Sequence, residues 1–170
     1  SYFSPEDRLK GITLQTAEWR RPPANTIPTD AKAAGLYMIC TLSKHKAEKD
    51  GFTDALMLDY EGKVAESTGS NIFFVFNGEL HTPIPHCFLD GITRQTAISI
   101  AEKQGIKVVQ RDIFPEEIKD AQEIFLTGSA VEINPVRKID DLEFKVGKVT
   151  SMISELYLSE VDKNYKIDNL

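Results

Sequence analysis

The sequence has few of the features that would mark a disulfide-rich, membrane-spanning or nucleic-acid-binding protein. Only two of its 170 residues are cysteines, Cys40 and Cys87. A chain of this length can bury a core without disulfide bonds, so we expect reduced thiols and a cytoplasmic location. No apolar run reaches the roughly 18–20 residues of a membrane-spanning helix, and the first residues lack the layout of a signal peptide. A net charge of −6 disfavours nucleic acid and acidic membranes as partners.

Several catalytic and metal-binding patterns are missing as well. There is no Gly-x-Ser-x-Gly elbow and no Walker phosphate loop. His81, His86 and Cys87 lie close together, but their spacing matches no zinc site, so no metal is expected. Acidic side chains recur through a later segment and are interpreted as a solvated surface: Asp112, Glu116, Glu117, Asp120 and Glu123.

Alternating apolar residues and turn signals predict an α+β chain with the size of one domain. Strands are expected at 11–17, 52–59, 64–65, 71–76, 79–82, 106–110, 123–127 and 131–139, the last broken by Pro135. Helices are expected from 33 to Gly51, at 91–104 with Asp90 as N-cap, at 114–120 and at about 146–158. The paired prolines predict a loop at 20–25, and Asn77-Gly78 predicts a hairpin turn.

Lys32 is the first candidate for chemistry. It stands among small residues, in Thr29-Asp30-Ala31-Lys32-Ala33-Ala34-Gly35, at the start of a helical pattern. A lysine nucleophile needs a lowered pKa, which burial or a nearby cation could supply. An ordinary surface lysine remains the alternative, and periodicity alone does not pair Lys32 with Tyr37, five residues on.

Three later segments offer groups that suit a flat, anionic ligand. In residues 66–71 the carboxylate of Glu66 leads into a small, polar loop. Residues 91–94 open a helix with a glycine, and free backbone N–H groups at such a start bind anions. Residues 127–130 form a small-residue loop with hydroxyl groups directly after a strand. Taken singly, each is more simply interpreted as a surface turn or a plain helix start.

Taken together and in this order, the segments 25–32, 66–73, 89–94 and 127–136 resemble those of the class IV pyridoxal-phosphate aminotransferases. The resemblance runs over nearly the whole chain, to about Glu160. The stretch 31–37 and the loop 127–132 look most like those of branched-chain amino-acid aminotransferases.

The resemblance assigns roles at the reacting end of the site. Lys32 looks like the lysine that holds the cofactor as a Schiff base and shuttles the substrate α-proton. Glu66 matches the carboxylate that faces the pyridine nitrogen and keeps it protonated. Tyr37 matches the phenol bonded to the ring oxygen, and Leu89 would pack on the ring face.

It also assigns the phosphate end. Backbone N–H groups of Ile92 and Thr93 would bind the phosphate. Ser129 replaces the family's usual threonine and keeps the hydroxyl for the same phosphate. The N–H groups of Ser129 and Ala130 would lie near the substrate carboxylate, and Arg21 matches an arginine whose role is taken as structural.

The implied fold is the large domain of the family, a β pseudo-barrel with surrounding helices. Family members carry a smaller N-terminal domain before the equivalent of Ser1, so residues 1–170 are expected to form the cofactor-binding large domain alone. The implied function is pyridoxal 5′-phosphate-dependent transamination of branched-chain L-amino acids with 2-oxoglutarate through a Lys32 Schiff base, in a full-length homodimer. The alternatives are a folded cofactor-binding fragment with no activity of its own, or a D-amino-acid aminotransferase or aminodeoxychorismate lyase of the same family.

Overall fold

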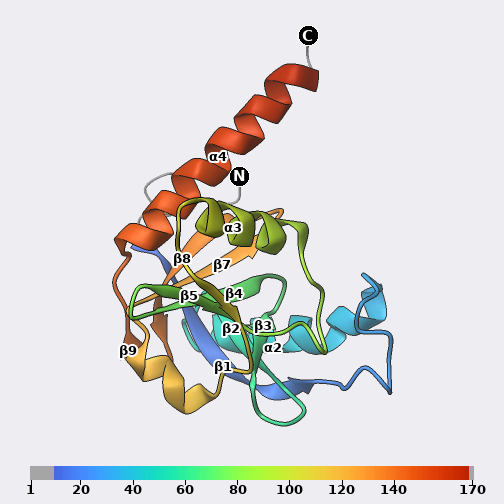
Figure 1. Cartoon of the computed structure of the whole chain (residues 1–170). Coiled ribbons are helices and arrows are strands. Elements are labelled where there is room, and N and C mark those ends of the chain that lie inside the picture. Colours follow the sequence, from blue (N-terminus) through green and yellow to red (C-terminus); the bar gives the residue numbers. More distant parts are fainter. Residues whose placement is uncertain (1–9, 169–170) are drawn as a thin grey trace.

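The computed structural model describes residues 10–168, with side chains through residue 161. Its centre is a closed barrel of strands with helices packed on the outside (Figure 1). This arrangement confirms the expected α+β class and the expected pseudo-barrel with surrounding helices.

Six strands form the barrel: β1 (Ile12–Arg21), β2 (Asp54–Asp59), β3 (Val64–Ser67), β4 (Asn71–Phe76), β7 (Glu123–Gly128) and β8 (Glu132–Ile139). Their order is β3-β2-β1-β8-β7-β4, and β4 pairs back with β3 to close the ring. β1 runs parallel to both of its neighbours, and the other barrel pairs are antiparallel. Outside the ring, β5 (Glu79–Thr82) and β6 (Val108–Gln110) extend from β4, and β9 (Leu142–Glu143) pairs with β8.

The helical elements are η1 (Ala34–Tyr37), α2 (Met38–Lys49), α3 (Ile92–Lys103), η2 (Pro115–Asp120) and α4 (Lys148–Asp168). α2 packs on β1 and β2, whereas α3 and α4 contact each other and the β7–β8 side of the sheet. In Figure 1, α4 leads from the sheet away from the body of the molecule. None of the helices within residues 10–168 is both long enough and apolar enough to cross a membrane.

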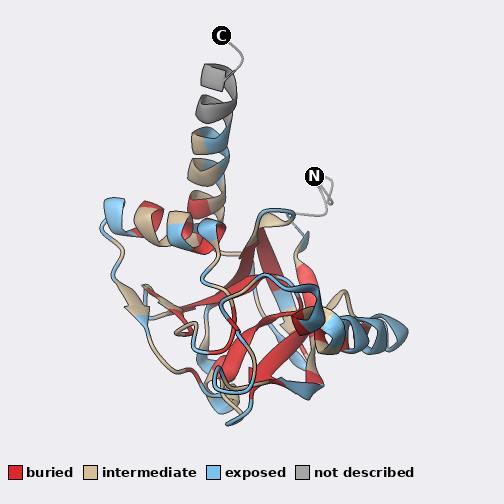
Figure 2. Cartoon of the chain, turned by 90° about the vertical axis from the view of Figure 1, so that its right-hand side faces the viewer, coloured by how far each residue is buried: buried red, intermediate tan, exposed pale blue. Residues whose placement is uncertain are grey.

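Successive residues of the apolar strand β4 point to opposite sides of the sheet. Both sides are covered, so the side chains are buried on both faces. Ile72 and Phe74 belong to the cluster inside the barrel, and Phe73 and Val75 belong to the cluster under α3 and α4. Phe73 also stacks on Phe125 of β7, with ring centroids 5.0 Å apart. Figure 2 shows the resulting concentration of buried residues on the strands. The loops at the ends of the barrel are therefore joined to strands that are packed on both faces.

Two sequence-based boundaries were wrong near β1 and β8. The expected loop at 20–25 begins later, because Arg20 and Arg21 pair with Leu58 and Asp59 of β2 and so extend the strand. Pro135 does not interrupt β8, since it lies opposite Phe125 while the ladder to β1 begins only at Val136. A proline is tolerated where its missing N–H has no ladder partner.

One predicted turn is confirmed, and the predicted end of the last helix is wrong. Asn77 and Gly78 both have positive φ, 50° and 79°, which confirms the predicted tight hairpin between β4 and β5. The last helix begins at Lys148 and continues to Asp168, ten residues past the expected end at 158.

Glu123 was wrongly grouped with the acidic surface. Its side chain is buried, and its carboxylate accepts hydrogen bonds from the Val149 N–H at 3.2 Å, the Thr150 N–H at 2.8 Å and the Thr150 hydroxyl at 2.7 Å. A negative charge is favourable at a helix N-terminus, so Glu123 fastens the start of α4 to β7. The backbone of Gly147 passes so close that a Cβ there would overlap the Glu123 carboxylate.

Candidate active site

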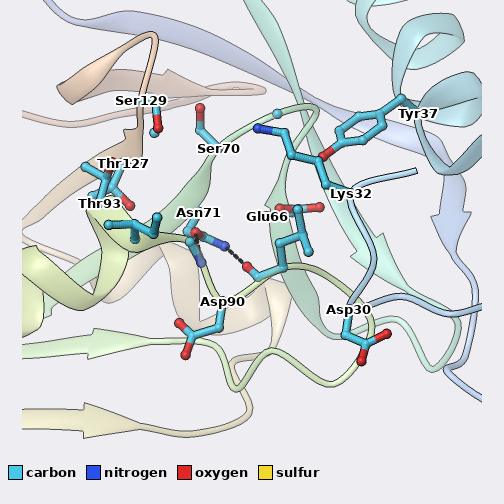
Figure 3. A pocket seen from close by; sticks show the side chains of 15 residues that line it. Asp30, Lys32, Tyr37, Glu66, Ser70, Asn71, Asp90, Thr93, Thr127 and Ser129 are labelled. Carbon is cyan, nitrogen blue, oxygen red and sulfur yellow. Dashed lines mark hydrogen bonds between the residues drawn. The ribbon is translucent and has the colours of Figure 1, made fainter. Parts of the chain in front are cut away.

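A cavity of about 290 Å³ lies between the loop after β1, the β3–β4 connection, the start of α3 and the β7–β8 turn (Figure 3). All seven residues predicted to bind a cofactor line it: Lys32, Tyr37, Glu66, Leu89, Ile92, Thr93 and Ser129. Ala130, predicted near the substrate carboxylate, is exposed in the turn beside Ser129 and is not among the lining residues. The structure thus brings together four segments that are far apart in the sequence.

An amine and a phenol lie on one side of the cavity. Lys32 is exposed in the irregular segment between β1 and η1, and Tyr37 is the last residue of η1. Both side chains reach into the same pocket in Figure 3. Burial, followed by the nearby Glu66 carboxyl, raises the pKa of the Tyr37 phenol. The phenol therefore keeps its proton at neutral pH and can donate a hydrogen bond.

The Glu66 carboxyl lies at the floor of this side and is only 7% exposed. Burial raises its pKa to about 8 and the nearby Asp54 adds to the rise, although the Arg21 guanidinium pulls in the other direction. Arg21 Nε lies 3.4 Å from Glu66 Oε1, but it donates its hydrogen bond to the Cys87 carbonyl, so it contributes attraction without replacing the lost hydration. Glu66 can therefore hold a proton at the floor of the cavity.

The opposite side of the cavity is the N-terminus of α3. Asn71 of β4 fixes the turn before it, with its Nδ2 donating to the Leu89 carbonyl at 2.8 Å and its Oδ1 accepting from the Gly91 N–H at 3.2 Å. A Cβ on Gly91 would lie 2.5 Å from Asn71 Oδ1, so this close approach requires glycine. The free N–H groups of the first helical turn then face the cavity end that Ile92 and Thr93 line, which suits an anion.

Asp90 is not the N-cap of α3 that the sequence predicted. Gly91 holds that position without a side-chain cap, and the Asp90 carboxylate accepts a 2.6 Å hydrogen bond from Arg94 Nη1. Arg94 is buried and also donates to the Pro83 carbonyl at 3.1 Å and to Gln110 Oε1 at 2.8 Å. The arginine thus competes for Asp90 and ties the turn before α3 to β6 and the loop after β5.

Hydroxyl groups gather beside the helix start, from Ser70, Thr93, Thr127 and Ser129. Thr127 is 1% exposed, and its Oγ1 has no hydrogen-bond partner within the described part of the chain. Buried hydroxyls rarely stay unpaired, so a group bound at this end of the cavity could supply the missing partner.

His81, His86 and Cys87 lie in different surroundings. His81 accepts a 2.9 Å hydrogen bond from Arg111 Nε, His86 is exposed, and Cys87 is buried behind the cavity, where burial raises the pKa of its thiol to about 12. Within residues 10–161, no group of three or more His, Cys, Asp or Glu side chains is placed to hold a metal ion.

Three contributions to the site were not predicted from the sequence. The role of Asn71 as a clamp, the unpaired hydroxyl of Thr127 and the ion pair between Arg21 and Glu66 each depend on pairs of residues at least 18 positions apart, or on burial. Asn71 and Thr127 stood inside the quoted motifs, so their position was visible although their function was not.

Comparison with known proteins agrees with this geometry. Residues 1–139 match the family model described as amino-transferase class IV. A probable branched-chain-amino-acid aminotransferase of Rickettsia bellii is 40% identical over 157 residues, which are 90% of this chain and 54% of the relative. The crystal structure of the T.th. branched-chain amino acid aminotransferase with pyridoxamine 5′-phosphate superposes with a TM-score of 0.89 at 38% identity, over 93% of this chain and 53% of that one.

A second structure of the T.th. enzyme, complexed with N-(5′-phosphopyridoxyl)-L-glutamate, gives a TM-score of 0.86 at 38% identity over 89% of this chain and 52% of that one. The chain spans about half the length of the curated relatives it matches. Together with the barrel and the cavity, these matches show that the chain belongs to the class IV aminotransferase family.

Proposed function

We propose that this chain binds pyridoxal 5′-phosphate and uses Lys32 in the transamination of branched-chain L-amino acids with 2-oxoglutarate. The observation that carries the proposal is that one cavity brings together three groups that suit the cofactor. These are the exposed amine of Lys32, the buried carboxyl of Glu66 and the helix start at Thr93, which suits an anion. The similar T.th. enzyme was crystallised with pyridoxamine 5′-phosphate and with N-(5′-phosphopyridoxyl)-L-glutamate. These ligands support the choice of pyridoxal 5′-phosphate as cofactor and of the glutamate/2-oxoglutarate pair as one substrate pair.

The residues present fit this cofactor on structural grounds. The unpaired Thr127 hydroxyl and the close backbone at Gly91 and Gly128 leave a polar cradle of the kind that a phosphate would fill, because a Cβ at Gly128 would lie 2.9 Å from Ser70 Oγ. The N–H groups of Ile92 and Thr93 and the hydroxyl of Ser129 would hold the phosphate, and Leu89 would pack against the ring. At the other end, Glu66 would meet the ring nitrogen and Tyr37 the ring oxygen.

When bound, the cofactor supplies an electron sink for the pair of electrons left at the substrate α-carbon. Lys32 Nζ would hold the cofactor and move the proton at that carbon. The raised pKa of Glu66 would favour a shared proton between its carboxyl and a ring nitrogen, and the protonated Tyr37 phenol would donate to an oxygen of the ring. We also propose that residues 1–170 form the cofactor-binding domain of a homodimeric cytoplasmic enzyme.

The test is covalent trapping. The chain is incubated with pyridoxal 5′-phosphate, reduced with borohydride and digested, and the labelled lysine is identified by mass spectrometry. Label should accumulate at Lys32 and disappear in Lys32→Ala, while Lys44→Ala, which removes an exposed lysine of α2, should be labelled like the wild type. Label spread evenly over the surface lysines, or retained in Lys32→Ala, would contradict the assignment.

Turnover separates the remaining alternatives. Conversion of leucine and 2-oxoglutarate to glutamate by the 170-residue chain supports the branched-chain reaction. Labelling at Lys32 without turnover supports a chain that binds the cofactor but has no activity of its own. This is the second candidate function, because the chain covers only about half of the relatives it matches. Turnover of D-alanine or release of pyruvate from an aminodeoxychorismate would instead indicate another branch of the family.

A further inference from the structure

Arg21 lies directly behind the cavity and contacts three of the segments that build it. It is 3% exposed and stands at the end of β1. Its Nε lies 3.4 Å from Glu66 Oε1 and donates to the Cys87 carbonyl at 3.2 Å, two residues before Leu89. Its Nη1 donates to the Leu36 carbonyl at 3.2 Å, next to Tyr37, and approaches Cys40 Sγ at 3.3 Å.

We propose that Arg21 is a positioning residue, which acts through Glu66 and through the carbonyls of Leu36 and Cys87 to orient the floor of the cavity. Arginine suits this role because its planar head carries donors in several fixed directions, so one side chain can hold a carboxylate and two carbonyls together. Arg21 itself does not line the cavity, so it reaches a ligand only through these neighbours. The inference rests on the proposed function, because it assigns Glu66 to a cofactor.

The charge of Arg21 gives it an effect on Glu66 that a purely structural hydrogen-bond donor would not have. Five ionisable groups near Glu66 act on its carboxyl or respond to it: Arg21 of β1, Asp54 of β2, Tyr37 of η1, Cys40 of α2 and Cys87 of the loop before α3. Lys32 lines the same cavity. Among the five groups, Arg21 is the cation that favours the ionised carboxylate, and Asp54 and burial oppose it. Removing the charge should therefore raise the pKa of Glu66 further.

The experiment titrates Glu66 in the cofactor-free chain by carbon NMR of labelled glutamate carboxyl groups, with the resonance assigned by its loss in Glu66→Gln. Arg21→Gln removes the charge and keeps hydrogen-bonding ability, Arg21→Lys keeps the charge, and Arg20→Gln changes the exposed neighbour on the same strand. Loss of a cation within about 4–6 Å moves a carboxyl pKa by about one unit or more. We expect such a rise in Arg21→Gln, a smaller one in Arg21→Lys and none in Arg20→Gln. An unchanged Glu66 titration in Arg21→Gln overturns the proposal.

Stability at pH 9 provides the second readout if Arg21→Gln folds poorly. If Arg21 acts through Glu66, the Arg21→Gln change should destabilise the Glu66→Gln background less than it destabilises the wild type. Equal losses in the two backgrounds would make Arg21 a structural brace only and would also overturn the proposal. Because neither readout requires cofactor, a failure of labelling at Lys32 counts against the proposed function, whereas these results count for or against Arg21.

Discussion

The buried carboxyl of Glu66 makes a testable link between pH and the stability of the cofactor-free protein. Its pKa is raised from an ordinary 4.5 to about 8, chiefly by burial. The folded state therefore binds a proton that the unfolded state releases above pH 4.5, so this contribution to stability is complete in acid and is lost as the pH rises toward 8. The change Glu66→Gln keeps the shape of the protonated side chain and removes the titration.

The expected effect is large compared with the stability of a domain. The difference between 4.5 and about 8 corresponds to about 5 kcal/mol, and whole domains are stable by about 5–15 kcal/mol. About 4 kcal/mol of this is lost between pH 5 and pH 9. At roughly 2–4 °C per kcal/mol for a chain of this size, the melting temperature should fall by roughly 8–16 °C over that range.

Thermal unfolding followed by circular dichroism at constant ionic strength measures this slope. The wild type and Glu143→Gln, a change of an exposed glutamate on β9, should lose stability in parallel as the pH rises. Glu66→Gln should show a much flatter profile. If its melting temperature falls as steeply as that of the wild type, the titrating group is not Glu66 and the argument from burial is wrong.

Two further predictions concern glycine and asparagine contacts. Gly147→Ala should lower the free energy of unfolding by about 3 kcal/mol, because the new Cβ displaces the Glu123 carboxylate that binds the start of α4. Gly35→Ala has no atom within 4 Å of its added Cβ and should change the free energy of unfolding little. Chemical denaturation measures both variants. Asn71→Ala should weaken binding of pyridoxal 5′-phosphate by about tenfold, since the loss of its bond to the Gly91 N–H frees the turn before α3; a fluorescence titration that gives unchanged affinity would contradict the clamp.

The sequence predicted well those parts of the molecule that local patterns determine. The β-prone run of β4 and the Asn77-Gly78 pair both act over a few positions, and the structure has both as expected. The ordered motifs also placed Lys32, Glu66 and their companions around one cavity, because a resemblance carries tertiary information that periodicity lacks.

Two of the failures share one physical cause, which is the demand of a buried charge or a helix end for a partner. Asp90 has the side chain of an N-cap, but the buried Arg94 needs a counter-charge and takes it. Glu123 reads as one more surface acid, yet the start of α4 needs an anion and lies beside it. In both cases a local preference of about 1 kcal/mol is weaker than the need to satisfy a buried charge or a helix end.

The closure of the barrel gives the cavity a second role. β3 and β4 are paired through a single pair of residues, Glu66 and Asn71, and the connection between them is held by the Ser67 N–H bonded to the Ser70 carbonyl at 2.8 Å. The junction of the ring with the fewest paired residues therefore lies at the wall of the cavity. A molecule held by Glu66 at one end and by the turn that Asn71 clamps at the other would span that junction. Occupancy would then resist local opening of the barrel, and slowed hydrogen exchange at the Ser67 amide would report it without any turnover.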